Sequence, residues 1–387
     1  MDVESVQTVV IGGGQAGLAV SHELSERGLP HVVLDAGERV GDSWRRRWDS
    51  LRLFTPAKYD GLPDLPFPGG PWSFPGKDDV ANYLETYALE MDLPVRLRTR
   101  VDRLESQPGG GFTAHLGAEA ITSDNVVVAT GTRGRTPHVP EFAGALAQSI
   151  RQLHSTEYRR PSQLSTGSTL VVGASHSGCE IAYEVAEHLP VTLCGRYTGN
   201  EPFAPGSGPD QIFTPLMVLV ANHVLTRRTP PGRKVMRYVR GPHHGAPTAR
   251  IKRRHLVERG VRWLEQRVTG VSEAGKPVLA DGTVLDMTTV IWCTGSSTTS
   301  SGSICRSSIR RAGHASTAAW STRRPGSSSA GSSSSTRSVR WCCRVSAATL
   351  PTSPAGSLSG AANGPGSLPD PGHNRPPQAP CSTQSDA

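Results

Sequence analysis

Three glycines near the N-terminus, Gly12, Gly14 and Gly17, have the GxGxxG spacing of a loop that binds the pyrophosphate of a dinucleotide. In such a loop the first glycine makes a tight turn and the second lets backbone N–H groups approach the phosphates. The third glycine allows a helix to pack closely on the preceding strand. Gln15 and Ala16 lie between the last two glycines, where the N-terminus of that helix favours a phosphate.

An acid follows at the distance that this chemistry requires. Asp35 ends the segment HVVLD, where a carboxylate binds the ribose hydroxyls of the adenosine. Strand, loop, helix, strand and acid therefore occur in the expected order. The alternative is a glycine-rich turn without a nucleotide.

A second loop repeats the pattern about 160 residues later. Gly173 and Gly178 match the outer glycines, while Ser175 replaces the middle one and Ser177 precedes the helix. The next strand, VTLCGR, ends in Arg196, which we match with Asp35 of the first unit. An acid suits a ribose diol, whereas an arginine suits a 2′-phosphate, so this loop is predicted to bind NADP(H). The alternative for Arg196 is a solvated charge at a strand end, and His176 is expected only to line the loop.

Short apolar strands and helical periodicity position these loops. Thr8–Ile11 and Thr169–Val172 are predicted strands that precede them, and residues 16–27 have the apolar spacing of a helix. Two further strands end in a threonine and a glycine: one runs into Thr130 and Gly131, and the other spans residues 287–295. The pattern predicts an α/β fold with two Rossmann-like dinucleotide-binding domains, one inserted in the other. The expected segments are 1–160, 161–286, a return strand at 287–295 and a tail at 296–387.

Composition excludes several other classes of protein. The chain has 387 residues, enough for about two domains, and a net charge of +8. Residues 296–387 hold nine Arg and two Asp, which is +7, so the first 295 residues carry only +1 and no nucleic-acid surface is expected. The seven Cys form no CxxC pair and no Cys/His cluster, so neither a redox disulfide nor a metal site is predicted.

Targeting signals are also not evident. The N-terminus lacks a signal-peptide core, and no apolar run reaches the roughly 18–20 residues of a membrane-spanning helix. The run IFTPLMVLVANHVL at 212–225 favours a buried or partner-facing helix over one that lies on a membrane surface. The expected location is therefore the cytoplasm.

Together with the two loops, two further segments resemble the flavin-containing monooxygenase-like flavoproteins, which depend on FAD and NAD(P)H. Residues 40–56 are similar to the Gly-x-x-Trp segment that lies beside the flavin in that family, with Trp44 as its tryptophan. Residues 142–158 resemble its interdomain fingerprint, although the gap before the histidine is longer than usual. The fingerprint positions are filled by Phe142, Gly144, His154 and Tyr158. The similarity runs from about Thr8 to Gly295.

The resemblance implies FAD in the first loop and NADP(H) in the second. It further implies that NADPH reduces FAD, and that the reduced flavin reacts with O₂ to form a C4a-(hydro)peroxyflavin that oxygenates a small organic substrate. Because the cofactor carries this chemistry, no catalytic side chain is assigned. Trp44, Leu51 and Tyr59 either line the flavin or belong to the core.

Three other functions remain open. One is a related disulfide reductase, although its flavin-side CxxC is missing. Another is an NAD(P)H:flavin oxidoreductase that inserts no oxygen, and the third is an inactive nucleotide-binding remnant.

The sequence changes character after Gly295. Residues 296–387 contain 24 Ser with many Arg, Pro and Gly, which predicts a disordered tail. However, Trp341-Cys342-Cys343 is unusual for such a tail. If the reading frame begins one nucleotide earlier, the codons of these three residues encode Val-Leu, whichever Cys codons are used. With suitable codons the earlier frame also replaces Ser296 by Phe, and it gives a closing strand-to-helix segment like that of the family. We interpret residues 296–387 as the product of a one-nucleotide deletion near codon 296.

Overall fold

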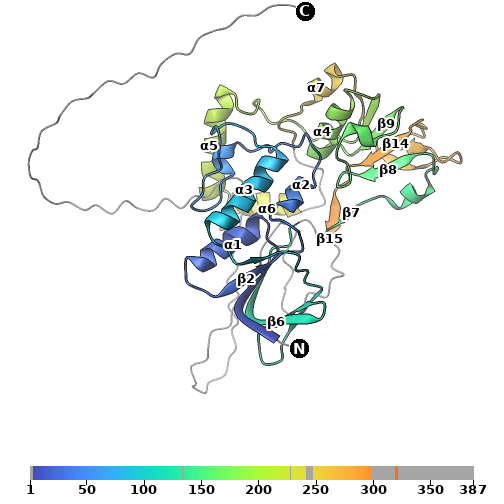
Figure 1. Cartoon of the computed structure of the whole chain (residues 1–387). Helices are drawn as coiled ribbons and strands as arrows, with labels where there is room; N and C mark the ends of the chain where they lie inside the picture. The colour runs from blue at the N-terminus through green and yellow to red at the C-terminus, as the bar shows by residue number, and fades with distance from the viewer. Residues whose placement is uncertain (1–2, 132–134, 227, 241–246, 299–318, 321–387) are drawn as a thin grey trace, which may run out of the picture. The chain divides into compact units, whose positions relative to one another are not determined.

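The computed structural model describes residues 3–131, 135–226, 228–240, 247–298 and 319–320 (Figure 1). The chain divides into two compact parts, Met1–Thr349 and Leu350–Ala387, and every described residue belongs to the first part. Below, the first and second units are the two Rossmann-like units, which both lie within this part. Most of the predicted tail, 296–387, therefore lies outside the described residues.

The first sheet places a glycine-rich loop at the carboxyl end of its central strand. Its strand order is β3-β2-β1-β6-β5-β4, and β16 also pairs with β6. β1 pairs in parallel with β2 and β6, whereas β5 is antiparallel to both β4 and β6. The strands are β1 (Val3–Ile11), β2 (His31–Leu34), β3 (Val95–Arg96), β4 (Arg103–Ser106), β5 (Phe112–Leu116), β6 (Glu119–Val128) and β16 (Ala319–Trp320).

Both faces of this sheet are buried, as expected for parallel strands covered on two sides. Successive valines of β1 alternate between two apolar clusters: Val9 belongs to one and Val10 to the other. α1 (Gln15–Ser25) and α3 (Lys77–Glu90) pack together through Leu18, Leu84 and Tyr87, and Figure 1 shows the two helices beside each other. The short helices α2 (Asp42–Arg45) and η1 (Ala57–Tyr59) lie between them in sequence.

The second sheet is entirely parallel, with the order β11-β10-β9-β14-β8. Every residue of β9, β10 and β14 is buried, which accounts for their continuous apolar sequences. α4 and α7 pack together in one apolar cluster of this unit. The strands are β8 (Arg151–His154), β9 (Thr169–Val172), β10 (Val191–Cys194), β11 (Arg262–Leu264) and β14 (Thr289–Trp292), and the two helices are α4 (His176–Val185) and α7 (Arg253–Glu258).

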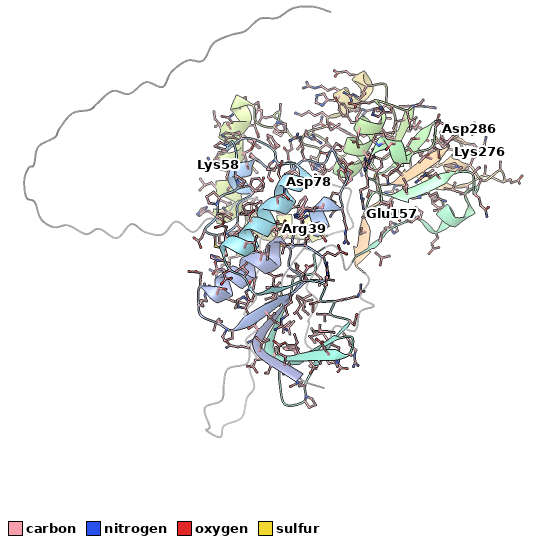
Figure 2. The ribbon with its side chains drawn as sticks, in the orientation of Figure 1. Arg39, Lys58, Asp78, Glu157, Lys276 and Asp286 are labelled. Carbon is pink, nitrogen blue, oxygen red and sulfur yellow. The ribbon has the colours of Figure 1, made fainter. Side chains whose placement is uncertain are left out.

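Smaller elements complete the chain. They are the hairpin β12 (Val268–Val271) and β13 (Pro277–Leu279), the antiparallel pair β7 (Arg135–Pro137) and β15 (Ser296–Thr298), the short helices η2 (Glu141–Ala145) and η3 (Pro161–Gln163), and the helices α5 (Gly208–His223) and α6 (Pro230–Arg240). Lys276 and Asp286, labelled in Figure 2, form an ion pair of 3.0 Å beside the hairpin.

The prediction of an α/β fold with two Rossmann-like units is confirmed, but the strand assignments differ from the expected segments. β8 lies before residue 161 and β14 lies after residue 286, yet both belong to the second sheet. The strand expected at 287–295 to return to the first sheet instead pairs with β9 and β8. A strand's neighbours are set by non-local pairing, which the local apolar pattern does not encode.

Candidate dinucleotide sites

The first glycine-rich loop connects β1 to α1 and is held by backbone contacts. The N–H of Gly12 donates to the carbonyl of Leu34 at 2.8 Å, and Gly12 has a φ of 108°, in the region that favours glycine. A Cβ on Gly12 would overlap the Ala129 backbone, and one on Gly17 would overlap the Gly12 carbonyl. The loop therefore requires glycine at both positions for packing alone.

Gly14 has a different environment. It is the N-cap of α1 and provides no side-chain cap, and a Cβ added there would have no heavy atom within 4 Å. The following residues, Gln15, Ala16 and Gly17, form the first turn of α1, whose N–H groups have no partner within the helix. The residues thus fit a bound pyrophosphate, because there is space beside Gly14 and backbone donors begin at that point.

Asp35 closes the same loop from the end of β2. Its Oδ2 accepts a hydrogen bond from the Gly13 N–H and its Oδ1 accepts one from the Gly37 N–H, both at 2.6 Å. A carboxylate has about four acceptor positions, so two remain for hydroxyl donors. Asp35 is half-buried beside the loop, as the sequence predicts for a ribose-binding acid.

The second loop reproduces the backbone of the first. Gly173 has a φ of 110°, and its N–H donates to the Cys194 carbonyl at 2.7 Å. A Cβ on Gly173 would overlap the Cys293 backbone, and one on Gly178 would overlap the Gly173 carbonyl. Ser175 occupies the N-cap position of α4, and Ser177 is in its first turn.

The hydrogen bonds of the two loops correct one sequence match. Gly12 bonds to Leu34 and Gly173 bonds to Cys194, so the residue after Cys194, Gly195, corresponds to Asp35. Arg196 lies one position further on. A side chain at residue 195 would press against the Ala174 backbone, which excludes an acid at this point. Sequence matching missed this shift because a one-residue offset leaves the apolar pattern of the strands unchanged.

Arg196 is exposed beyond the end of β10. In the part of the chain that the structure describes, no hydrogen bond or ion pair is recorded for its guanidinium. Beside it, Trp263 donates through Nε1 to the Gly195 carbonyl at 2.9 Å, and the Tyr197 and Trp263 rings meet edge to face. This arginine can therefore accept an anionic group without losing an existing ion pair.

The threonine–glycine turns lie against the two loops. The backbone of Thr130 would meet a Cβ on Gly12, and Gly131 follows with a φ of 59°. In the second unit Gly295 has a φ of 79°, and Thr294 donates through its hydroxyl to the His138 carbonyl. Cys293, which directly precedes this second turn, lies against the second loop, since a Cβ on Gly173 would overlap its backbone.

Trp48, within residues 40–56, is a buried residue that the sequence pattern did not indicate. Trp44 is half-buried and packs in the cluster of α1 and α3, and Tyr59 contacts Trp72. Trp48 is buried in the cluster that includes Tyr158 and Ala174 of the second unit, and Leu51 packs against that cluster. The indole N–H of Trp48 has no hydrogen-bond partner. Its four-residue spacing from Trp44 was the available sequence signal.

Among the fingerprint residues, His154 links β8 to the turn after β14. His154 is buried; its Nε2 donates to the Gly295 carbonyl at 3.0 Å, and its Nδ1 accepts from the Thr156 N–H at 3.2 Å. Burial lowers the pKa of His154, which agrees with a neutral ring that joins β8 to the turn after β14. Glu157, labelled in Figure 2, accepts from the His154 N–H at 2.7 Å.

The other fingerprint residues support the same unit. The Tyr158 hydroxyl donates to Glu184 Oε2 at 2.7 Å, and Phe142 meets Trp292 edge to face. For Gly144, a Cβ would have no heavy atom within 4 Å.

The described cysteines are placed as packing residues. Cys179 and Cys194 are buried, and burial raises the pKa of each thiol to about 12, while it also raises that of Cys293. A thiol that stays protonated is a poor nucleophile and a poor redox group. Among the described residues, no group of three or more His, Cys, Asp and Glu is arranged to hold a metal ion.

We therefore expect single replacements of Cys179, Cys194 and Cys293 by Ala to retain NADPH-dependent reduction of the flavin. Some loss of stability is expected, because each change removes a buried group. The measurement is anaerobic bleaching of the flavin in flavin-loaded, frame-restored protein, meaning protein expressed with one nucleotide restored near codon 296. Circular dichroism confirms folding. Complete loss of bleaching in a folded variant would contradict this expectation.

Two loops of this geometry, each at the carboxyl end of a central parallel strand, define a protein with two dinucleotide-binding units. The chain belongs to the pyridine nucleotide-disulphide oxidoreductase family, whose model matches residues 9–205. It is 31% identical over 290 residues to the uncharacterized oxidoreductase CzcO of Bacillus subtilis, a match that covers 74% of this chain and 80% of that protein.

Other relatives match about half of the chain. A CzcO-like uncharacterized oxidoreductase of Geobacillus kaustophilus is 40% identical over 188 residues, 49% of this chain and 53% of that protein. The indole-3-pyruvate monooxygenase YUCCA1 of Oryza sativa is 33% identical over 46% of this chain and 45% of its own. The chain therefore aligns with only about half the length of each of these two relatives.

Solved structures with this fold include a flavin monooxygenase. The enzyme from Stenotrophomonas maltophilia, solved as a mutant, superposes with a TM-score of 0.56 at 28% identity and covers 76% of this chain and 79% of its own. A bacillithiol disulfide reductase from Staphylococcus aureus shares the fold at 17% identity, with a TM-score of 0.53 over 76% of this chain and 77% of its own. The chain thus belongs to an oxidoreductase family with flavin monooxygenase-like members.

Proposed function

We propose that this chain is built as an FAD- and NADPH-dependent monooxygenase that acts on a small organic substrate and O₂. The observation that carries the proposal is the pair of loops with one backbone geometry and different residues at the following strand end. The first has Asp35 there, and the second has Gly195 followed by Arg196. The monooxygenases among the relatives support the reaction class.

In this proposal the first loop binds FAD. The N–H groups from Gly14 to Gly17 hold the pyrophosphate, Asp35 holds the ribose, and Thr130 and Gly131 flank the loop. Trp44 would lie near the flavin and packs against the apolar cluster of α1 and α3. Bound flavin, once reduced by NADPH, would supply the reaction with O₂. The protein's own contribution is to hold both nucleotides and to exclude water.

The second loop would bind NADP(H). Gly173, Ser175, Ser177 and Gly178 surround the pyrophosphate position, and Arg196 reaches the 2′-phosphate. Because Gly195 leaves no acid at the strand end, nothing there repels that phosphate. The buried thiols of the described residues argue against disulfide reduction. We keep the segments 1–160 and 161–286 as the proposed binding domains, with β8 and β14 reassigned to the second one because they pair in its sheet.

Replacement of Arg196 by Ala is expected to weaken NADP⁺ binding by roughly 10- to 100-fold and NAD⁺ binding by less than about twofold. A charge-assisted hydrogen bond contributes roughly 1.5–3 kcal/mol, and only NADP⁺ carries the phosphate that would make it. Calorimetric titration with both nucleotides measures this without flavin.

The control is Arg267→Ala, which removes an exposed arginine just before β12. Equal losses for the two nucleotides in the Arg196 variant would refute the assignment of this loop to NADP(H). Incorporation of oxygen-18 from ¹⁸O₂ into a product would then separate a monooxygenase from an oxidoreductase that inserts no oxygen.

A further inference from the structure

The helix α5 is apolar but not buried. Ile212, Leu216 and Leu219 are 76%, 55% and 55% exposed, and in this helix only Asp210 is buried. Residues at i, i+4 and i+7 share one helix face, so the three side chains form a continuous apolar stripe. The apolar sequence of residues 212–225 predicts a buried or partner-facing helix, and the structure excludes burial.

The exposed apolar surface continues beyond α5. Val224 follows the helix at 47% exposure, and Val235 of α6 is 43% exposed. A tight connection joins the two helices: the Thr229 hydroxyl donates to the Thr226 carbonyl at 3.0 Å, and the Arg233 N–H donates to the Thr229 carbonyl at 3.0 Å. Several exposed large apolar side chains in one short segment indicate an interaction site.

Beyond Asp210, which is buried in the first turn of α5, the same region carries basic charge without acids. Residues 211–257 contain no Asp or Glu and ten basic residues: Arg227, Arg228, Arg233, Lys234, Arg237, Arg240, Arg250, Lys252, Arg253 and Arg254. Within the connection after α5 and in α6, Arg228, Arg233, Lys234 and Arg237 are exposed. The ion pairs recorded for the described residues include none of these four. Their charge is therefore left for an outside partner.

We propose that the surface formed by Ile212, Leu216, Leu219, Val224 and the basic residues 228–237 binds the interface of a membrane that contains anionic lipids. An interfacial helix inserts an apolar face shallowly, while nearby Lys and Arg attract acidic headgroups. Among the described residues, no helix is long and apolar enough to cross a membrane, so this surface would lie on a bilayer.

Charge argues against the main alternative, a second copy of the chain. Pairing two such helices about a two-fold axis would bring two acid-free basic segments together, and like charges repel. An anionic bilayer neutralises the basic residues and covers the stripe at the same time. It also needs no groove that fits the convex helix.

The test is flotation of protein expressed with one nucleotide restored near codon 296, which lacks the nine arginines of residues 296–387. The vesicles are phosphatidylcholine alone or phosphatidylcholine with 30% phosphatidylglycerol. We expect flotation only with the anionic vesicles and a strong decrease at high salt. Ile212→Ser/Leu216→Ser/Leu219→Ser and Arg233→Glu/Lys234→Glu should each weaken binding about tenfold or more. Aggregates sediment, whereas partly unfolded protein that adheres to lipid would also float with phosphatidylcholine alone, so the neutral vesicles separate misfolding from binding. The readout needs no cofactor.

The matched controls are Leu89→Ser and Arg100→Glu. Leu89 on α3 is 76% exposed, like Ile212, and the side chain of Arg100 is 81% exposed. Both control variants should float like the parent protein. Three results would each overturn the proposal: no binding to anionic vesicles, an equal loss in the controls, or light scattering that shows a dimer abolished by the triple replacement while vesicles are not bound.

Discussion

Restoration of one nucleotide near codon 296 is expected to convert a colourless or insoluble protein into a yellow one that oxidises NADPH. In the restored frame the segment after Thr294–Gly295 would read as the family's closing strand and helix. In the chain as given, Ser, Arg and Pro residues replace it, and these cannot bury an apolar face.

The first sheet shows where such a segment is needed. β6 pairs with β5 only along residues 119–123, while it pairs with β1 as far as Val128. Beside Val127 and Val128, the described partner on the other edge is β16, two residues long. A returning strand and helix would extend this edge, next to the loop where FAD is proposed to bind.

The expected effect is large because the missing strand and helix would add buried apolar side chains beside the core of the first sheet. Val126 and Val127, which are 4% and 1% exposed, belong to the two apolar clusters of that sheet. The loss of several further buried side chains costs roughly 1.5–3 kcal/mol each, which would cancel a typical stability of about 5–15 kcal/mol. The second unit, whose sheet is built from residues 151–292, should lose less.

The measurement is expression of both versions side by side, with flavin absorbance per protein and NADPH oxidation as readouts. The control is restoration with a stop codon after residue 298, which should behave like the chain as given. If the chain as given purifies with one FAD per chain and turns over NADPH, our interpretation of residues 296–387 is wrong.

Both loops could be predicted from the sequence because their determinants are local. Gly12, Gly17, Gly173 and Gly178 are each required by a backbone contact within a strand–turn–helix unit, so their spacing is preserved in any chain that folds this way. Asp35 was found for the same reason, since its carboxylate binds the N–H groups of that loop.

The features that the sequence did not reveal depend on distant parts of the chain. The pairing of β14 with β8 joins residues more than 130 positions apart, and no local pattern specifies it. The exposure of α5 has the same origin, because the apolar sequence of a helix does not show whether other parts of the fold bury it. The offset of Arg196 from Asp35 required the hydrogen-bond register of both loops.

Gly14 and Gly17 of the first loop are expected to fail in different ways when replaced by Ala. In Gly17→Ala the new Cβ would overlap the Gly12 carbonyl, so α1 must move away from β1. Forcing atoms into a packed site typically costs about 1–3 kcal/mol, and a clash with backbone should reach about 3 kcal/mol or more. In Gly14→Ala the Cβ meets no protein atom, and the φ of −84° suits alanine.

Gly14→Ala should therefore fold nearly normally, with a loss of about 1 kcal/mol or less, but bind FAD at least tenfold more weakly. Its methyl group would occupy the space proposed for the pyrophosphate, and backbone N–H groups could no longer approach it closely. Urea unfolding of the apoproteins and FAD titration of the frame-restored protein measure the two effects separately. Gly178→Ala, the counterpart of Gly17 in the second loop, should lose stability in the same way. Normal FAD affinity in Gly14→Ala would place the nucleotide elsewhere, since the methyl group could not then lie in its path.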